Sequence, residues 1–207
     1  MNWQTQLPLI AILRGVTPEE IEDHVVELID AGITLIEIPC NSPQWLHSVE
    51  IALKVAAGRA VIGAGTVLTI ADTDALAATG AQLMVTPNTE PTLIRHAVAA
   101  GLTCAIGFLT PSEAFAALAA GAQILKLFPA LNLGAGYVRA LKAVLPPAVP
   151  LFAVGGVTPA NLADFLGAGC MGAGLGSDLY APGQAATVTR ARAELFVQAF
   201  KKNSRKP

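Results

Sequence analysis

The chain has 207 residues, of which 53% are hydrophobic, and its 13 Lys and Arg nearly balance its 15 Asp and Glu, for a formal net charge of −2. This balance excludes a strongly basic nucleic-acid surface and an acidic tail. No stretch reaches the ~18 uninterrupted apolar residues of a membrane span, so the apolar content predicts a core buried on several sides, as in a parallel α/β protein. The N-terminus shows no basic region followed by an apolar segment, and we expect no signal peptide.

Short apolar segments alternate with stretches of helical periodicity along the whole chain. We expect eight strands, at residues 9–14, 34–39, 60–66, 83–87, 103–108, 124–128, 151–155 and 170–175. Three helices should begin at a capping Thr followed by Pro, at Thr17-Pro18, Thr110-Pro111 and Thr158-Pro159. Helix ends are marked by a glycine that can adopt the left-handed conformation, at Gly32, Gly80, Gly101, Gly121 and Gly169.

This alternation of β and α segments implies a parallel sheet, and eight units imply a single compact (β/α)8 TIM barrel. An open doubly wound sheet is the alternative. It would usually show a Gly-x-Gly-x-x-Gly turn after the first strand, and Arg14-Gly15-Val16-Thr17 does not fit that pattern. No linker divides the chain, so we expect a barrel catalytic domain over residues 1–200 and a basic, disordered tail over residues 201–207.

Lys126 lies in the apolar run Ile124-Leu125-Lys126-Leu127-Phe128-Pro129, which is typical of a buried strand. Alternation along that strand places Ile124, Lys126 and Phe128 on one face. Loss of solvation should lower the pKa of a lysine there, and a neutral amine can attack a carbonyl to form a Schiff base. The alternative is a lysine that reaches solvent from the strand end or pairs with a carboxylate.

The active site of a (β/α)8 barrel lies at the C-terminal ends of its strands. The polar residues expected at those ends are Arg14, Glu37, Asn41, Thr66, Thr86, Lys126 and Ser177. Glu37 should point into the barrel, because its neighbours Ile36 and Ile38 suit the face that packs on helices. It could act as a general acid and base, or it could form a structural ion pair with Arg14 or Lys126, and the two roles are compatible.

Two glycine-rich segments follow the seventh and eighth expected strands, Val154-Gly155-Gly156-Val157 and Gly174-Leu175-Gly176-Ser177. These positions are the usual phosphate site of the fold, which indicates a phosphorylated ligand. Arg14 suits a substrate carboxylate, which we favour, or the phosphate, and an ion pair with Glu37 is the structural alternative. Thr66 could donate a hydrogen bond to a bound keto acid or cap the next helix.

The three histidines, His24, His47 and His96, fall in helical stretches away from the strand ends. A catalytic metal would need histidines and carboxylates at the mouth of the barrel, so we predict no metal site. The cysteines, Cys40, Cys104 and Cys170, are far apart and lie in or near apolar runs. They favour a reducing compartment, and we predict a cytoplasmic protein that binds no nucleic acid or membrane.

These motifs together resemble the short class I aldolases that cleave 2-keto-3-deoxy-6-phosphosugar acids into pyruvate and glyceraldehyde 3-phosphate. The matching segments are Ile36–Pro39, Gly63–Leu68, Val85–Pro87, Lys126–Ala130 and Gly155–Val157. The resemblance implies a Schiff base on Lys126, a proton shuttle by Glu37, a reaction without a metal or organic cofactor, and a homotrimer. It also implies contacts with the phosphorylated substrate by Arg14, Thr66, Pro87, Phe128, Val154, Gly155, Gly156, Gly176 and Ser177.

The family has a phosphogluconate-type and a phosphogalactonate-type branch, whose substrates differ in configuration at C4. The first typically has an arginine and a threonine where this chain has Asn41 and Val154, and segments 11–15 and 174–180 resemble the second, which we favour. Ile106-Gly107 replaces the Pro-Gly of many relatives and should alter the rim of the pocket. The alternatives are a phosphogluconate or 4-hydroxy-2-oxoglutarate aldolase, a phosphate-binding isomerase or epimerase, and a non-catalytic barrel.

Overall fold

A computed structural model of the chain describes residues 2–203 and contains all eight expected strands, each end within two residues of its expected position. The strands are β1 (Leu9–Ile12), β2 (Leu35–Pro39), β3 (Val61–Gly65), β4 (Leu83–Val85), β5 (Thr103–Phe108), β6 (Ile124–Leu127), β7 (Leu151–Val154) and β8 (Gly172–Leu175). All neighbouring pairs are parallel, and β8 pairs with β1 to close the barrel. The (β/α)8 fold is therefore confirmed, and the open sheet is wrong.

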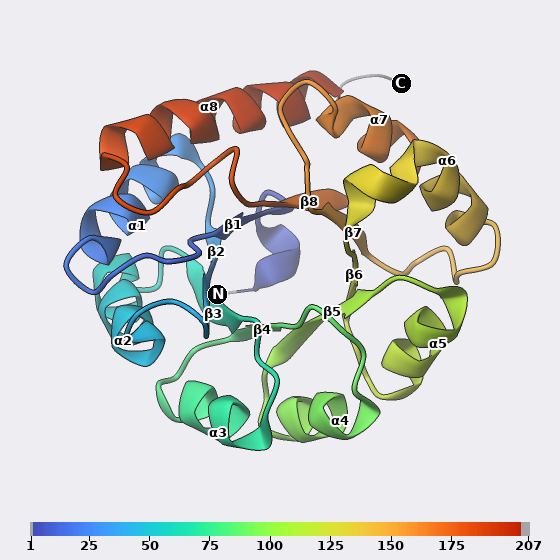
Figure 1. Cartoon of the computed structure of the whole chain (residues 1–207), viewed down its shortest axis with the longest axis horizontal. Coiled ribbons are helices and arrows are strands. Elements are labelled where there is room, and N and C mark those ends of the chain that lie inside the picture. The colour runs from blue at the N-terminus through green and yellow to red at the C-terminus, as the bar shows by residue number, and fades with distance from the viewer. Residues whose placement is uncertain (1, 204–207) are drawn as a thin grey trace.

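A ring of helices surrounds the barrel, as Figure 1 shows in a view down its axis. They are α1 (Ile21–Ala31), α2 (Trp45–Ala56), α3 (Ile70–Ala78), α4 (Pro91–Ala99), α5 (Pro111–Ala119), α6 (Ala130–Lys142), α7 (Leu162–Gly167) and α8 (Ala186–Asn203). A short 3₁₀ helix, η1 (Trp3–Thr5), precedes β1, and Trp3 packs against the apolar side chains inside the barrel. No helix within residues 2–203 has the length and apolar character needed to cross a membrane.

The core has two layers, which follow from the alternation of side chains along each strand. Inside the barrel lie Ile10, Leu35, Val61, Leu83, Val85, Ala105, Ile124 and Phe152. The opposite strand faces, which include Ile36, Ile38, Leu125 and Leu127, pack against the helices. The predicted faces of β2 and β6 are therefore confirmed, and Glu37 and Lys126 belong to the inner one.

Only one of the three Thr-Pro segments begins a helix as predicted. At α5, the Thr110 side chain accepts a hydrogen bond from the Glu113 backbone, and the Glu113 side chain accepts one from the Thr110 backbone. By contrast, α1 begins at Ile21 and α7 at Leu162, three residues later than expected. Before α7, Thr158 and Asn161 bond each other reciprocally at 2.8 and 3.3 Å, which closes a turn ahead of the helix.

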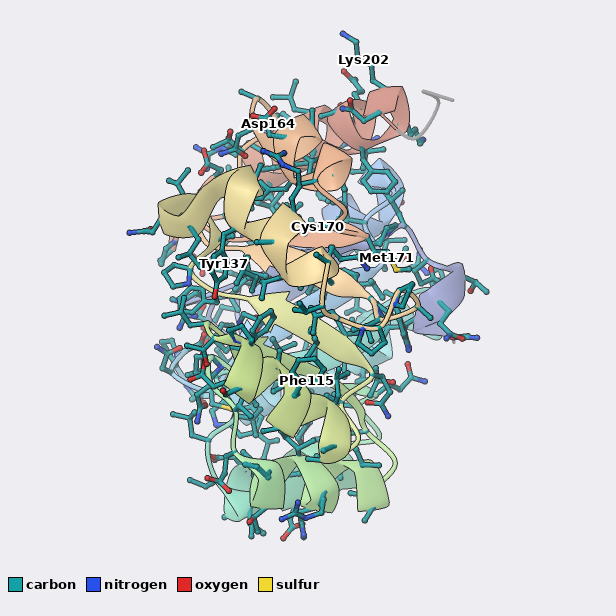
Figure 2. All side chains as sticks on the ribbon, turned by 90° about the vertical axis from the view of Figure 1, so that its right-hand side faces the viewer. Phe115, Tyr137, Asp164, Cys170, Met171 and Lys202 are labelled. Atoms are coloured by element: carbon teal, nitrogen blue, oxygen red, sulfur yellow. The ribbon has the colours of Figure 1, made fainter. Side chains whose placement is uncertain are left out.

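The helix ends match the glycine pattern, since all five predicted glycines have φ between +82° and +112°, where L side chains are strained. The last helix differs from the expectation. Residues 201–203 continue α8 and do not form a tail, because that helix is anchored by the buried Phe196 and Val197 one to two turns earlier. Figure 2 places Lys202 on this last turn. Residues 204–207 lie outside the described residues.

Candidate active site

A cavity of about 270 Å³ opens at the C-terminal ends of the strands. It is lined by ten of the eleven residues predicted for the site, namely Arg14, Thr66, Pro87, Lys126, Phe128, Val154, Gly155, Gly156, Gly176 and Ser177. The eleventh, Glu37, lines a smaller adjoining hollow inside the barrel, and Lys126 lines both. The cavity is also lined by Ile12, Val157 and Asp178, which are not among the predicted site residues.

Lys126 occupies the third position of β6 and is only 7% exposed. Burial lowers the pKa of its ammonium group; the Glu37 carboxylate opposes that shift, and the Arg14 guanidinium adds to it. The nitrogen lies 5.3 Å from the centroid of the Phe128 ring. Within residues 2–203 no salt bridge joins Lys126 to a carboxylate, although the Glu37 charge acts on it, so neither a solvent-reaching nor a salt-bridged lysine describes this residue.

Glu37 lies at the centre of β2 and is 1% exposed. Burial raises its pKa to about 7, against the opposing effects of the Lys126 and Arg14 charges. Its Oε2 atom is buried and has no hydrogen-bond partner among the described residues. An unpartnered buried carboxylate oxygen is costly and calls for a functional explanation. A carboxyl group that titrates near neutral pH can both accept and donate a proton there.

Gly65, the last residue of β3, makes room for that carboxyl group. A Cβ atom at this position would lie 1.9 Å from Glu37 Oε2 and 2.3 Å from its Cδ, distances that no folded protein tolerates. The Glu37 carboxyl group therefore packs directly against the Gly65 backbone. Glycine at this position of β3 therefore leaves the space that the Glu37 carboxyl group of β2 occupies.

Arg14 follows β1 and is held by two side-chain hydrogen bonds. Its Nη1 donates to Asn41 Oδ1, and its Nη2 donates to Thr66 Oγ1 at 3.4 Å. No ion pair joins Arg14 to Glu37 in the described part of the chain, so that structural alternative is wrong. The guanidinium retains donors that a substrate anion can accept.

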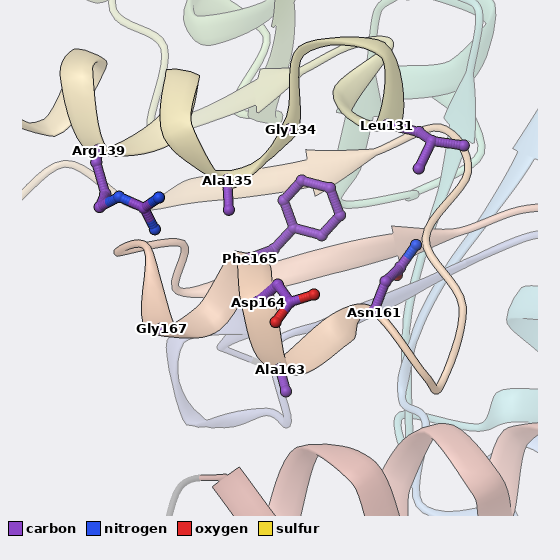
Figure 3. Close-up of a pocket in the computed structure, with 9 residues that line it drawn as sticks. All are labelled: Leu131, Gly134, Ala135, Arg139, Asn161, Ala163, Asp164, Phe165 and Gly167. Atoms are coloured by element: carbon purple, nitrogen blue, oxygen red, sulfur yellow. The ribbon is translucent and has the colours of Figure 1, made fainter.

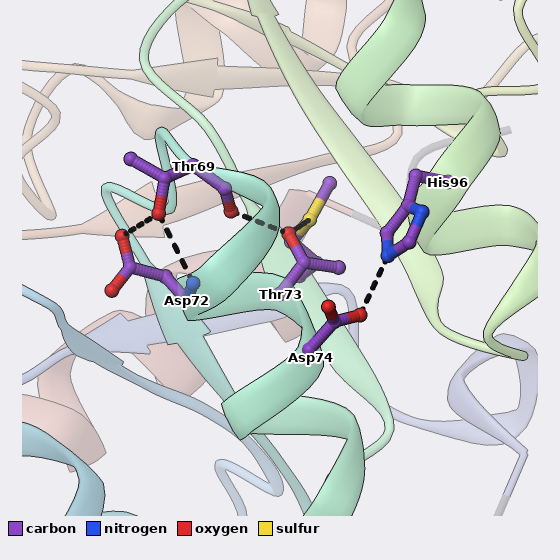
Figure 4. Close-up of polar contacts among 6 residues, drawn as sticks. Thr69, Asp72, Thr73, Asp74 and His96 are labelled. Atoms are coloured by element: carbon purple, nitrogen blue, oxygen red, sulfur yellow. Dashed lines mark hydrogen bonds and ion pairs between the residues drawn. The ribbon is translucent and has the colours of Figure 1, made fainter.

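Thr66 does not cap the next helix, which was one of its two predicted roles. The cap of α3 is Thr69, whose Oγ1 accepts from the Asp72 backbone N–H at 3.0 Å (Figure 4). Thr66 itself has φ +54°, a left-handed conformation that is rare for a β-branched residue. Such strain tends to collect where a side chain must be aimed at a functional site, and here the hydroxyl lies in the cavity beside Arg14.

The two glycines after β7 have positive φ angles and lie close to neighbouring side chains. Gly155 and Gly156 have φ +94° and +73°. A Cβ at Gly155 would lie 3.2 Å from the Phe128 ring, and one at Gly156 would lie 2.6 Å from Leu131. Gly176, after β8, has open space where a Cβ would be. Both loops thus expose backbone at the cavity, as an anion site requires.

The histidines lie on helices, as predicted. His24 on α1 is buried beside Thr189, His47 on α2 pairs with Glu50, and His96 on α4 lies 2.6 Å from Asp74 (Figure 4). Within residues 2–203 no group of three or more His, Cys, Asp or Glu side chains is arranged to hold a metal ion.

A larger groove, of about 540 Å³, lies on the outside of the molecule between α6 and α7 (Figure 3). Its charged residues, Arg139 and Asp164, are both exposed. The groove contains no buried titratable group, and charges in full contact with water have ordinary chemistry. The candidate active site is therefore the smaller cavity at the strand ends.

Comparisons with known proteins agree with this geometry. A model of the family described as KDPG and KHG aldolase matches residues 2–191. A curated protein of Escherichia coli K12, named 2-dehydro-3-deoxy-6-phosphogalactonate aldolase, is 55% identical over 97% of this chain and 98% of its own length.

Two solved structures are similar over almost the whole chain. One, described as a native KDPGal structure, is 53% identical, covers 100% of both chains and has a TM-score of 0.97. The other, a porous protein cage designed by fusing symmetric oligomeric domains, is 54% identical over 97% of this chain and 74% of that one, with a TM-score of 0.95. The family resemblance of the sequence motifs is confirmed: the chain belongs to the KDPG and KHG aldolase family and is an aldolase, a carbon–carbon lyase.

Proposed function

We propose that the protein is a class I aldolase that cleaves 2-dehydro-3-deoxy-6-phosphogalactonate into pyruvate and glyceraldehyde 3-phosphate. The observation that carries this proposal is the presence of two buried reactive groups, Lys126 and Glu37, that form no salt bridge with each other. Burial lowers the pKa of Lys126 and raises that of Glu37, and both side chains line the hollow inside the barrel. The choice of substrate is supported by the 55% identity to the phosphogalactonate aldolase of Escherichia coli.

The reaction begins when the neutral amine of Lys126 attacks the C2 ketone, and loss of water gives a protonated imine. The imine accepts the electron pair of the C3–C4 bond as that bond breaks, which leaves an enamine on Lys126 and releases the aldehyde. Glu37 takes the proton of the C4 hydroxyl through a water molecule and returns a proton to C3 of the enamine. Hydrolysis of the resulting imine releases pyruvate and restores the amine. This route uses no metal or organic cofactor.

The two ends of the substrate are assigned to different walls of the cavity. Arg14 binds the carboxylate, with its guanidinium held by Asn41 and Thr66. The phosphate binds to backbone N–H groups of the loops after β7 and β8, next to Gly156 and Ser177. Anchoring both ends orients the C3–C4 bond between the lysine and the glutamate.

We further infer a cytoplasmic homotrimer. All three cysteines are free, and two of them, Cys104 and Cys170, are buried, which suits a reducing compartment. The designed cage, a relative at 54% identity, was built from symmetric oligomeric domains, which supports an oligomer here. Light scattering of the purified chain should give three times the monomer mass of 21.3 kDa, and a monomer or dimer would contradict the trimer.

The Schiff base is tested by incubating the protein with pyruvate and borohydride and locating the mass adduct by peptide mapping. We expect one adduct, on Lys126, and none in Lys126→Met, which should also lose cleavage activity. Lys54→Met, which changes an exposed lysine on α2, is the matched control and should keep both. An adduct elsewhere, or turnover by Lys126→Met, would overturn the proposal.

The substrate is tested by comparing kcat/KM for the two C4 epimers of the phosphorylated keto acid. We expect faster cleavage of the galacto epimer. Equal rates would reject the phosphogalactonate assignment and leave the aldolase chemistry intact.

A further inference from the structure

The loop between β8 and α8, residues 176–185, forms one wall of the cavity and then turns into the protein. Gly176, Ser177 and Asp178 line the cavity. The next two side chains, Leu179 and Tyr180, are 0% and 3% exposed. The backbone N–H groups of Leu179 and Tyr180 both donate to the Gly176 carbonyl, at 2.9 and 3.0 Å, which closes a tight turn. Whatever holds this turn sets the position of the backbone that faces the cavity.

Gln184 holds the turn through its side-chain amide, whose four hydrogen-bonding positions are all occupied. Its Nε2 donates to the Leu179 carbonyl at 2.9 Å and to Thr189 Oγ1 at 2.7 Å. Its Oε1 accepts from the Ala181 N–H at 3.3 Å and from Arg192 Nη1 at 3.0 Å. A carboxamide offers two donors and two acceptor lone pairs, so Gln184 is saturated.

Two of the partners of Gln184, Thr189 and Arg192, belong to helix α8, and the other two belong to the loop itself. Arg192 on α8 also donates to the Ser177 carbonyl at 3.4 Å, directly at the cavity wall. Thr189 on α8 is fully buried, and its Oγ1 lies 2.9 Å from Nδ1 of the buried His24 on α1. Figure 1 shows α1 and α8 side by side on the outside of the barrel. Gln184 thus ties the loop directly to α8, and Thr189 and His24 extend the connection to α1.

The same loop also touches the segment that follows the neighbouring strand β1. A Cβ atom at Gly15 would lie 2.7 Å from Cγ of Pro182, so the Pro182 ring rests on the backbone beside Arg14. The loop therefore spans from the residues assigned to the phosphate to the residue assigned to the carboxylate. A shift of the loop would alter the distance between the two anchoring points.

We propose that Gln184 is a positioning residue that sets the specificity for a phosphorylated substrate. It does not contact the substrate but fixes the Gly176–Ser177 backbone in the place where the phosphate accepts its hydrogen bonds. This inference rests on the proposed function, in which the loop after β8 receives the phosphate. The role of Gln184 differs from the roles of Lys126 and Glu37, because Gln184 affects the binding of the phosphate end of the substrate and not the cleavage of the C3–C4 bond.

The test compares a phosphorylated and an unphosphorylated substrate, 2-dehydro-3-deoxy-6-phosphogalactonate and 2-dehydro-3-deoxygalactonate. Gln184→Met removes all four hydrogen bonds at similar volume, and Gln184→Glu removes the two donated ones. For the phosphorylated substrate we expect Gln184→Met to raise KM about tenfold, the equivalent of one or two lost hydrogen bonds, with kcat within about twofold. For the unphosphorylated substrate, kcat/KM should not change.

Two further measurements separate the possible failures. Gln198→Met changes an exposed glutamine of α8 whose side chain makes no hydrogen bond within residues 2–203, and it should leave the kinetics with both substrates unchanged. If Gln184→Met does not fold, Gln184→Glu carries the test, with a smaller rise in KM expected. Equal losses on both substrates, or none in a folded variant, would overturn the positioning role. Failure of the wild-type protein to form the pyruvate adduct on Lys126 would instead reject the proposed function.

Discussion

The groove between α6 and α7 and the cavity at the strand ends differ in character, and the smaller of these two contains the reactive groups. The groove between α6 and α7, of about 540 Å³, is lined by Arg139 and Asp164, whose charges face water. The cavity at the strand ends has half that volume, about 270 Å³, but adjoins Lys126 and Glu37, whose charged forms are both disfavoured by burial. The comparison teaches that the active site is marked by desolvated groups without partners and not by the size of the opening.

The largest expected difference in kcat is between substitutions of two carboxylates, Glu37 in the barrel and Asp164 in the groove. Glu37→Gln removes the proton shuttle at constant shape, so kcat should fall by about 10² to 10⁴-fold, the usual contribution of general acid–base catalysis. Asp164→Asn should leave kcat unchanged. Steady-state cleavage rates with the proposed substrate check both. An active Glu37→Gln enzyme would show that another group moves the proton.

The next largest difference in kcat is expected between alanine substitutions of two glycines, Gly65 and Gly167. Gly65→Ala should displace the Glu37 carboxyl group, since the new Cβ would overlap it, and a displacement of about 1 Å can lower kcat by roughly 10²-fold. Gly167 lies in α7 beside the groove, and a Cβ atom at this position would have no atom within 4 Å. Gly167→Ala should leave activity unchanged and stabilise the helix by about 0.5–1 kcal/mol. Kinetics and thermal unfolding of the two variants measure both effects, and equal kinetics would refute the packing argument.

A smaller difference, in KM, is expected between substitutions of Arg14 in the cavity and Arg139 in the groove. Arg14→Met should raise KM for the keto acid by roughly tenfold or more, because a hydrogen bond to a charged group contributes about 1.5–3 kcal/mol. Arg139→Met removes an exposed guanidinium from the groove and should not change KM. Initial-rate measurements over a range of substrate concentrations distinguish the two. An unchanged KM in Arg14→Met would remove Arg14 from the binding site.

The smallest effect concerns stability against pH. The pKa of Glu37 is raised from its ordinary value of 4.5 to about 7, so between these values the folded state binds more protons than the unfolded state. Stability from this group is therefore fully present below pH 4.5 and declines as the pH rises toward 7. Glu37→Gln, which mimics the neutral acid, should gain a few degrees of Tm relative to wild type between pH 5 and pH 8. A constant Tm difference would contradict the raised pKa.

The sequence predicted the barrel and the two reactive groups because both depend on local patterns. Eight apolar segments and period-two alternation are visible without any partner residue, and they were sufficient to put Glu37 and Lys126 inside the barrel. A single charge in an apolar strand is also a strong signal, because burying it is costly.

The sequence did not predict what depends on distant partners or on competing turns. Nothing in the run from Gly176 to Gln184 indicates that one amide joins it to Arg192 and Thr189. The packing of Glu37 on Gly65 also requires the register between β2 and β3. The Thr-Pro pattern misplaced two helix starts, because a residue that caps a helix can equally close a turn before it.

The small helix η1 gives the barrel a floor. Trp3 packs against the inner side chains of the barrel, and because η1 directly precedes β1, it lies at the N-terminal ends of the strands, opposite the cavity that Lys126 lines. In the proposed mechanism the substrate and the water that hydrolyses the imine both reach Lys126 through the cavity at the strand ends. A substrate bound there displaces bulk water from the lysine, which favours hydrolysis of the imine after the aldehyde has departed.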